Sequence, residues 1–447
     1  MAGNLKARLG RIRSQVNAEG YHPAVPRSVL NHPGADKIPE RENPFPPPWV
    51  VLDPLVRFRS QIVPLQNEAL QNLAAVSPEF LEILFRNKGI APKSLSPQDL
   101  LFFDLETTGL SGGAGTVAFL AAFGEPVEQG LLIRQYLLLD YPGEAVFLQC
   151  IEQELNRKST AILVSYNGRA FDAQILRNRF AMQGRSLPER SHMDLLYISR
   201  LLWSGLVPSC SLGTLEAQVL HMKREGDIPG ALAPQIWFAF LREGPRGQAL
   251  EELLGVCDHN MLDIQGLAEL LNHVSQIGAD PLGILGRSTF NLDRLALAWP
   301  EGEERRRFLE EAALRGYGRA IYELARLVRR RGDWEAYRQL LEELVSETVV
   351  QVRIPPVLGQ PPVSQKPVSV RASRTLRLRA NINLASYYEW KEADLCRAEA
   401  CAMRACDLFE ALRAEQFTRG LRGAAPSIKL KLDQRLLRIR AKQRGAW

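Results

Sequence analysis

The middle of the chain carries short apolar runs that alternate with stretches of helical periodicity. Residues 100–103 are continuously apolar and predict a buried strand, and residues 116–124 predict a returning strand, so the two form a hairpin. Residues 130–140 predict a third strand. Residues 143–157 predict an amphipathic helix, and the apolar run at 161–166 predicts a buried parallel strand. This order of elements predicts a mixed α/β sheet flanked by helices.

Residues 302–412 have helical periodicity almost throughout. Two pairs of helices are predicted, one joined at residues 331–333 and the other near residues 390–392. Small residues recur where paired helices would cross, namely Ala325, Ala336, Ala385 and Ala398. The pattern resembles tetratricopeptide-type helical hairpins, and a proline-rich insert at residues 354–368 separates the two pairs. We therefore expect an all-α region that could recruit a protein partner.

These changes of pattern predict two folded regions, with other segments before, between and after them. In chain order the predicted parts are a basic, proline-rich lead-in with some helix (1–98), the α/β domain (99–278), a linker (279–301), the all-α region (302–412) and a basic C-terminal helix or tail (413–447). A length of 447 residues is enough for two or three domains.

Composition narrows the class of protein. The chain is 46% hydrophobic and 24% charged, as is ordinary for a soluble globular protein. Neither an apolar run long enough to span a membrane nor the apolar core of a secretory signal peptide is present, so no membrane association is expected. Six cysteines without a CxxC pair indicate a reducing compartment, and we expect a cytoplasmic protein.

The net charge of +6 suits a partner that carries phosphates. Basic residues concentrate after Arg413, where acidic residues are few. This segment is interpreted either as a set of phosphate contacts or as the solvated face of a helix, and the charge pattern alone does not choose between the two.

Candidate chemistry lies at the end of the first predicted strand. Asp104 and Glu106 are separated by one residue, so both side chains point to the same face of the strand. Adjacent carboxylates repel each other unless a cation lies between them, and carboxylate oxygens are preferred ligands of Mg²⁺ and Mn²⁺. The pair therefore predicts a metal site, and the alternative is two solvated acids at a strand end.

Two further acids lie at structural transitions. Asp172 follows the strand at 161–166 and begins a helix, a position that ligand sites in α/β sheets favour. Residues 257–263 open another predicted helix, on which His259 and Asp263 are four residues apart and share a face. If the four carboxylates converge, they could hold two divalent cations, and a nearby histidine is suited to act as a general base.

These segments resemble the motifs of a known superfamily. Residues 104–109 (DLETTG), 167–172 (NGRAFD) and 259–263 (HNMLD) resemble the three motifs of the DEDD exonuclease superfamily, which has a ribonuclease H-like fold. The flanking segments LSGGAGTVAFL, HMDLLYISRLLW, SCSLGTLE and DIPG narrow the resemblance to the YprB-type ribonuclease H-like domain. The resemblance covers residues 100–275.

The resemblance implies a ribonuclease H-like sheet whose first three strands are antiparallel. It implies two Mg²⁺ or Mn²⁺ ions and a 3′–5′ exonuclease that acts on single-stranded ends of DNA or RNA. The implied ligands are Asp104, Glu106, Asp172 and Asp263, with His259 as the base or as the group that orients water. His259 lies four residues before Asp263, where the tyrosine branch of the superfamily has its tyrosine, whereas the histidine branch has its histidine five before. The alternative for His259 is a helix-start residue that hydrogen-bonds locally.

Two other functions remain open at the level of sequence. One is a nucleic-acid-binding adaptor with little or no nuclease activity, in which the basic tail contacts phosphates. The other is a hydrolase of small phosphodiesters such as short oligonucleotides. Among the remaining residues of the matched segments, Asp194 is predicted to cap a helix or to support the site from behind, and His192 to be structural.

Overall fold

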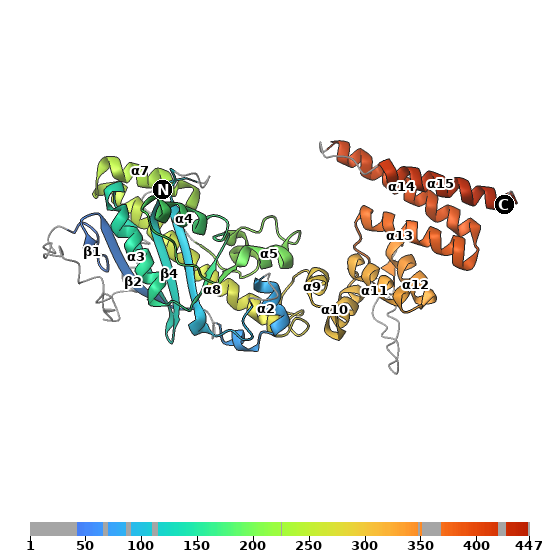
Figure 1. The fold of residues 1–447 in the computed structure, drawn as a ribbon, viewed down its shortest axis with the longest axis horizontal. Coiled ribbons are helices and arrows are strands. Elements are labelled where there is room, and N and C mark those ends of the chain that lie inside the picture. Colours follow the sequence, from blue (N-terminus) through green and yellow to red (C-terminus); the bar gives the residue numbers. More distant parts are fainter. Residues whose placement is uncertain are drawn as a thin grey trace. The chain divides into compact units, whose positions relative to one another are not determined.

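The structure is a computed structural model. It describes residues 43–65, 70–85, 91–109, 115–224, 226–346, 349–350, 368–418 and 426–445. The chain divides into two compact units, Met1–Phe290 and Asn291–Trp447 (Figure 1). Apart from Val368, the predicted proline-rich insert lies outside the described residues.

The first unit is built on a seven-stranded mixed sheet. Its strands are β1 (Val50–Asp53), β2 (Val56–Val63), β3 (Leu100–Thr107), β4 (Ala118–Val127), β5 (Gly130–Leu138), β6 (Ile162–Ser165) and β7 (His192–Asp194). Their order across the sheet is β1-β2-β5-β4-β3-β6-β7. Strands β1 to β5 pair antiparallel, whereas β6 pairs parallel with β3, and β7 pairs parallel with β6. The predicted α/β class, the hairpin and the parallel strand are confirmed.

Strand β3 is covered on both faces, which explains its uninterrupted apolar run. Phe103 belongs to a core that includes residues of α3 (Glu144–Arg157) and α7 (Ala233–Glu243). Its neighbour Phe102 points to the other face, where Gly124 of β4 and Ile264 of a third helix meet it. Both phenylalanines are buried. Asp104 and Glu106 continue the face of Phe102, because side chains of a strand alternate.

The third helix, α8 (Gly247–Ala279), is 33 residues long and crosses the sheet (Figure 1). Its close approach requires Gly124, where a Cβ atom would lie 2.5 Å from Cγ2 of Ile264. The sequence predicted that this helix opens at residue 257, and that prediction is wrong by ten residues, since the helix begins at Gly247. Residues 247–256 already carry helical periodicity, and no proline or turn signal separates them from the rest.

The parallel strands β6 and β7 each lead into a helix, α4 (Asp172–Met182) and α5 (Leu195–Trp203). Because parallel strands end at the same edge of a sheet, the start of α4 lies beside the end of β3. The other α-helices in the described part of this unit are α2 (Pro78–Phe85) and α6 (Leu212–Gln218). Short 3-10 turns occur at Gln71–Ala75, Pro97–Asp99, Tyr141–Gly143 and Gly230–Leu232.

Strands β1 and β2 lie inside the segment predicted as a lead-in, so the sheet begins well before residue 99. Strand β2 pairs with β5 from Val56 to Val63. Its strand pattern is concealed by Arg57 and Arg59, which are charged yet buried. Arg59 pairs with Asp258 at 2.8 Å and donates to Gln135, and these partners are distant in sequence. Burial of a charge depends on such partners, which local pattern does not reveal.

The second unit is helical. Its helices are α9 (Leu292–Ala298), α10 (Glu303–Leu314), α11 (Gly318–Arg330), α12 (Trp334–Val345), α13 (Arg374–Tyr387), α14 (Leu395–Thr418) and α15 (Pro426–Gln443), with a π-helical turn at Tyr388–Glu392 and a short strand pair, β8 (Val349–Val350) and β9 (Val368–Ser369). Both predicted helix pairs are present, α11 with α12 and α13 with α14. Helix α9 occupies part of the predicted linker at 279–301. The likeness to tetratricopeptide repeats stays a prediction.

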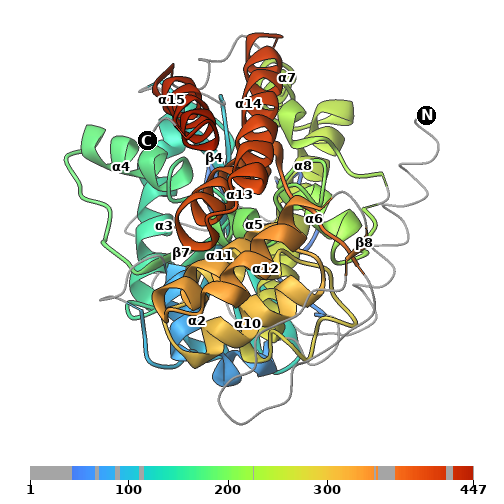
Figure 2. The same cartoon turned by 90° about the vertical axis from the view of Figure 1, so that its right-hand side faces the viewer.

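Some basic side chains of α15 form contacts within the second unit. It lies along α14 (Figure 2), with Leu432 and Ile439 buried. Glu389 of the π-helical turn is buried and accepts hydrogen bonds from Arg438 at 2.7 and 2.8 Å and from Lys442 at 2.9 Å. The basic C-terminal segment is therefore neither a simple solvated face nor wholly available for phosphate. Among the described residues, no helix combines the length and the apolar character needed to cross a membrane.

Candidate active site

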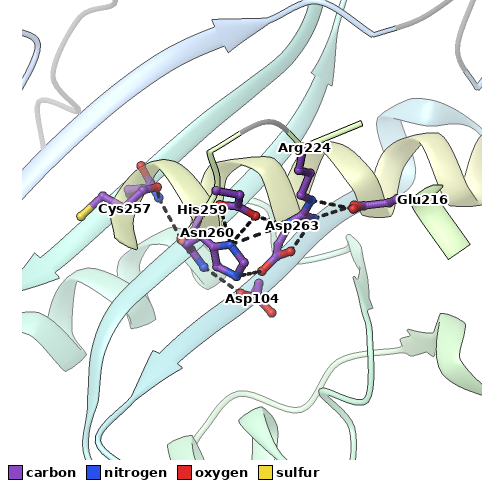
Figure 3. A network of polar contacts seen from close by, with 9 residues as sticks. Asp104, Glu216, Arg224, Cys257, His259, Asn260 and Asp263 are labelled. Atoms are coloured by element: carbon purple, nitrogen blue, oxygen red, sulfur yellow. Dashed lines mark hydrogen bonds and ion pairs between the residues drawn. The ribbon is translucent and has the colours of Figure 1, made fainter. Parts of the chain in front are cut away.

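Asp104 is held in place by a chain of amides that runs back into the sheet. Asn260 of α8 donates from Nδ2 to Oδ2 of Asp104 at 2.7 Å. Gln135 of β5 donates from Nε2 to Oδ1 of Asn260 and to the carbonyl oxygen of Cys257, both at 2.8 Å (Figure 3). Gln135 and Asn260 are almost completely buried. This network fixes one oxygen of Asp104 and leaves Oδ1 free of any such bond among the described residues.

Asp172 reaches the same edge from the turn between β6 and α4. It is buried at the first position of α4. Gly168 has to be a glycine here, because a Cβ atom would lie 2.8 Å from Oδ2 of Asp172. The turn is shaped by Asp194, which accepts from the backbone amides of Asn167 at 2.8 Å and Arg169 at 3.2 Å.

The two residues predicted to be supporting have such roles. Asp194 also accepts from the amide of Leu196 at 3.1 Å, so the predicted helix cap is confirmed. His192 lies with Nε2 2.7 Å from Oγ of Ser165, and burial lowers the pKa of His192 to about 4. A histidine with so low a pKa is neutral at physiological pH, as a structural side chain would be.

Helix α8 brings Asp263 and His259 to the face of β3 that carries the first two acids. Nε2 of His259 lies 3.3 Å from Oδ2 of Asp263. One donor atom from each of Glu106, His259 and Asp263 lies within 4.8 Å of the other two. His259 is more than three turns inside α8, so the helix-start interpretation of this residue is wrong.

The four acids lie close enough together for the charge of one to shift the pKa of another. Burial raises the pKa of Asp104 well above its usual range, and the negative charges of Asp263, Asp172 and Glu106 raise it further. The pKa of Glu106 is likewise raised by burial, and then by Asp263, Asp172 and Asp227. Burial, and then Asp194, raises the pKa of Asp172 to about 7. All five residues singled out in the sequence thus come together.

Sequence reasoning missed a second layer of charge around Asp263. Arg224 donates from Nη2 to Oδ1 of Asp263 and to Oε1 of Glu216, each at 2.6 Å (Figure 3). Its Nη1 donates to Oδ2 of Asp227 at 3.2 Å. Glu216 and Asp227 stand in the segments SCSLGTLE and DIPG, which the motif comparison had already marked. The presence of those motifs was the only signal, because their contacts with α8 cross long stretches of chain.

Comparison with known proteins now identifies the region that holds this site. Residues 101–275 match the RNase_H superfamily. They form a ribonuclease H-like domain. The chain is also 36% identical over 190 residues to "Uncharacterized protein YprB" of Bacillus subtilis (strain 168), which supports the predicted YprB-type resemblance. That match covers 42% of this chain and 44% of YprB, so the chain spans less than half of this relative.

One solved structure is distantly similar to part of this chain. It is the structure of the family B DNA polymerase from the hyperthermophilic archaeon Pyrobaculum calidifontis. The two chains are 14% identical, with a TM-score of 0.31, and the match covers 44% of this chain and 28% of the polymerase. Similarity of this degree carries no conclusion about function.

The donor set of the ribonuclease H-like domain fits hard divalent cations. In the part of the chain that the structure describes, no lysine or arginine forms an ion pair with Asp104, Glu106 or Asp172. Their negative charges are therefore compensated by no basic side chain, although they are close enough to repel one another. Carboxylate oxygens clustered in this way suit Mg²⁺ or Mn²⁺.

Proposed function

We propose that the ribonuclease H-like domain hydrolyses phosphodiester bonds of nucleic acid in a metal-dependent reaction. The observation that carries this proposal is the convergence of Asp104 with three other carboxylates, each of which raises its pKa. Three of these acids, Asp104, Glu106 and Asp172, form no ion pair with a basic side chain in the described part of the chain, and such carboxylates suit a cation that must also contact an anionic substrate. The resemblance of the three motifs to DEDD exonucleases supports removal of nucleotides from the 3′ end of a single strand.

In this proposal Asp104, Glu106, Asp172 and Asp263 would hold two Mg²⁺ or Mn²⁺ ions. Bound there, the ions would supply charge stabilisation for the attacking and the leaving oxygen of the phosphodiester. Asn260 keeps the Asp104 carboxylate in its orientation, since it donates to one of the two oxygens. Arg224 orients Asp263 in the same way.

His259 would act on the attacking water. A neutral imidazole accepts a proton from water at Nε2, and the resulting hydroxide forms a bond to phosphorus. The bond between phosphorus and the 3′-oxygen of the shortened strand then breaks, and the electron pair stays on that oxygen. The products are a nucleoside 5′-monophosphate and a strand that is one nucleotide shorter.

The deciding experiment measures degradation of 5′-end-labelled single-stranded DNA and RNA by the full chain with Mg²⁺, with Mn²⁺ and with EDTA. We expect a metal-dependent ladder that shortens from the 3′ end, and a loss of more than about 100-fold in rate for Asp104→Ala. Glu252→Gln serves as the control, because Glu252 also belongs to α8 but its carboxylate accepts from Gln248 at the surface, away from the four acids. Cleavage at the wild-type rate by Asp104→Ala would overturn the proposal.

A further inference from the structure

The side chain of His259 is attached to a carboxylate that is not one of the four acids. Nδ1 of His259 lies 2.9 Å from Oδ1 and 2.8 Å from Oδ2 of Asp227. Both side chains are largely buried, with 13% and 16% of their surfaces exposed. An ionised carboxylate only accepts hydrogen bonds, and both ring nitrogens lie near one. Nδ1 is the closer, at 2.8 and 2.9 Å from Asp227 against 3.3 Å between Nε2 and Asp263, so the single hydrogen of a neutral ring belongs to Nδ1. A neutral His259 bonded in this way has its lone pair on Nε2.

This tautomer matters because Nε2, the nitrogen with the lone pair, lies toward the acids. Nε2 lies on the side of the acids, 3.3 Å from Oδ2 of Asp263. The 3-10 turn Gly230–Leu232 passes close over it, and a Cβ atom on Gly230 would lie 3.0 Å from Nε2. A glycine at this position leaves the ring edge uncovered. The nitrogen that carries the lone pair is therefore the one that faces the site.

Asp227 is itself fixed to α8 by its neighbours. Ile228 packs against the helix at Gly255, where a Cβ atom would lie 2.4 Å from Cδ1 of Ile228. Arg224 donates from Nη1 to Oδ2 of Asp227 and from Nη2 to Asp263. Nη1 also lies 3.5 Å from Nδ1 of His259, but two N–H donors do not bond each other, and Asp227 is closer to both. The carboxylate of Asp227 thus receives hydrogens from the ring and from the guanidinium.

We propose that Asp227 is the positioning residue of His259, which holds the ring with its hydrogen on Nδ1 and with Nε2 turned to the four acids. This inference rests on the proposed nuclease function and adds a residue to it. When Nε2 takes the proton of the attacking water, the carboxylate of Asp227 stabilises the imidazolium that forms. A carboxylate behind a working histidine commonly fixes its tautomer and orientation in this manner.

The first readout is the tautomer itself. In full-length protein with ¹⁵N-labelled histidine and Mg²⁺, the ring nitrogens of His259 are assigned by comparison with His259→Gln, since the chain has six histidines. We expect the hydrogen on Nδ1 in the wild type. In Asp227→Asn we expect it to move at least partly to Nε2, because an amide can donate to Nδ1. Glu252→Gln, about two turns before His259 on the same helix, removes a carboxylate that accepts from Gln248 at the surface, and it should keep the wild-type tautomer.

The second readout separates turnover from binding. We expect Asp227→Asn to lower kcat by about 10- to 100-fold while KM and the concentration of Mn²⁺ at half-maximal rate stay within about twofold. Asp227→Glu, which restores the acceptor, should recover part of kcat. An unchanged tautomer in Asp227→Asn, or an equal loss of kcat in Glu252→Gln, would overturn the inference.

The experiments distinguish failure of the proposed nuclease function from failure of the role proposed for Asp227. A wild type that cleaves no substrate with either metal ion removes the nuclease proposal, and the tautomer readout still decides whether Asp227 sets the state of His259. A wild type that is active beside a fully active His259→Gln keeps the nuclease and refutes the role of the His259–Asp227 pair.

Discussion

Asp104 shows what single residues contribute to this protein. Its carboxyl group is buried, it is surrounded by three further acids, and its pKa is raised accordingly. Among the described residues, the contact that opposes these effects is the hydrogen bond from Asn260. Such an arrangement lowers the stability of the ionised, metal-free fold, and a cation that binds only the folded state would restore it.

The pH dependence of stability follows from Asp172, whose pKa is raised to about 7 in the folded protein. In the unfolded chain an aspartate titrates near about pH 4, so the folded state binds the extra proton between these values. Stability of the EDTA-treated protein is therefore expected to be highest at low pH within this window and to fall as pH rises through about 7.

Urea unfolding between pH 5 and pH 8 measures this slope. Asp172→Asn, which cannot ionise at this position, should show a flatter dependence, and Mn²⁺ should reduce the slope of the wild type. A slope in Asp172→Asn equal to that of the wild type would mean that another group causes the loss of stability.

At the scale of elements, α8 organises the site. It supplies His259, Asn260 and Asp263 from little more than one turn, and it packs against β3 and β4 on one side and α6 on another. Its glycines permit these approaches. At Gly266 a Cβ atom would lie 1.8 Å from Oε1 of Glu216, the residue that holds Arg224. The fit between α6 and α8 is therefore set by the absence of a side chain.

Two glycine-to-alanine variants test this fit. In a helix the change usually stabilises by up to about 1 kcal/mol, which is what we expect for Gly213→Ala of α6, where nothing lies within 4 Å of the added atom. For Gly266→Ala we expect a loss of about 1–3 kcal/mol in the free energy of unfolding, because Glu216 is buried and has to move. Equal stabilities of the two variants in urea would contradict the role assigned to Gly266.

At the scale of the whole molecule, the candidate site belongs to one of the two compact units. Every side chain named in it lies between residues 104 and 263, within Met1–Phe290. The helical unit contributes a different feature, the buried Glu389 that holds Arg438 and Lys442 of α15. Metal binding and loss of the Glu389 contacts should therefore change hydrogen exchange in different elements of the chain.

Amide hydrogen exchange of the full chain can measure both effects. Mn²⁺ is expected to slow amide exchange in β3, α4 and the middle of α8, because ligands that bind the folded state protect the elements that carry them. Glu389→Ala is expected to speed exchange in α13 to α15, since Arg438 and Lys442 lose their buried partner. Protection by Mn²⁺ confined to residues 291–447 would contradict the proposed metal site.

Much of the candidate site could be predicted because it rests on short segments. Asp104 and Glu106 are adjacent on one strand face, and Asp263 follows His259 by one helical turn, so local geometry already pairs them. Asn260 stands between His259 and Asp263 yet was not singled out, although it bonds Asp104 from 156 residues away. The local sequence around an asparagine in a helix does not indicate a hydrogen-bond partner so far away along the chain.

The sequence by itself determined the order of strands and helices from Leu100 to Met182, the α/β class, and the residue types that chemistry could use, because hydrophobic periodicity and motif spacing are properties of neighbours along the chain. Only the tertiary structure decided that β2 extends the sheet, that Arg438 and Lys442 pair with Glu389, and that Asp227 lies on the ring of His259. These contacts join residues separated by 32 positions or more, and their formation depends on how whole elements pack, which no local pattern encodes.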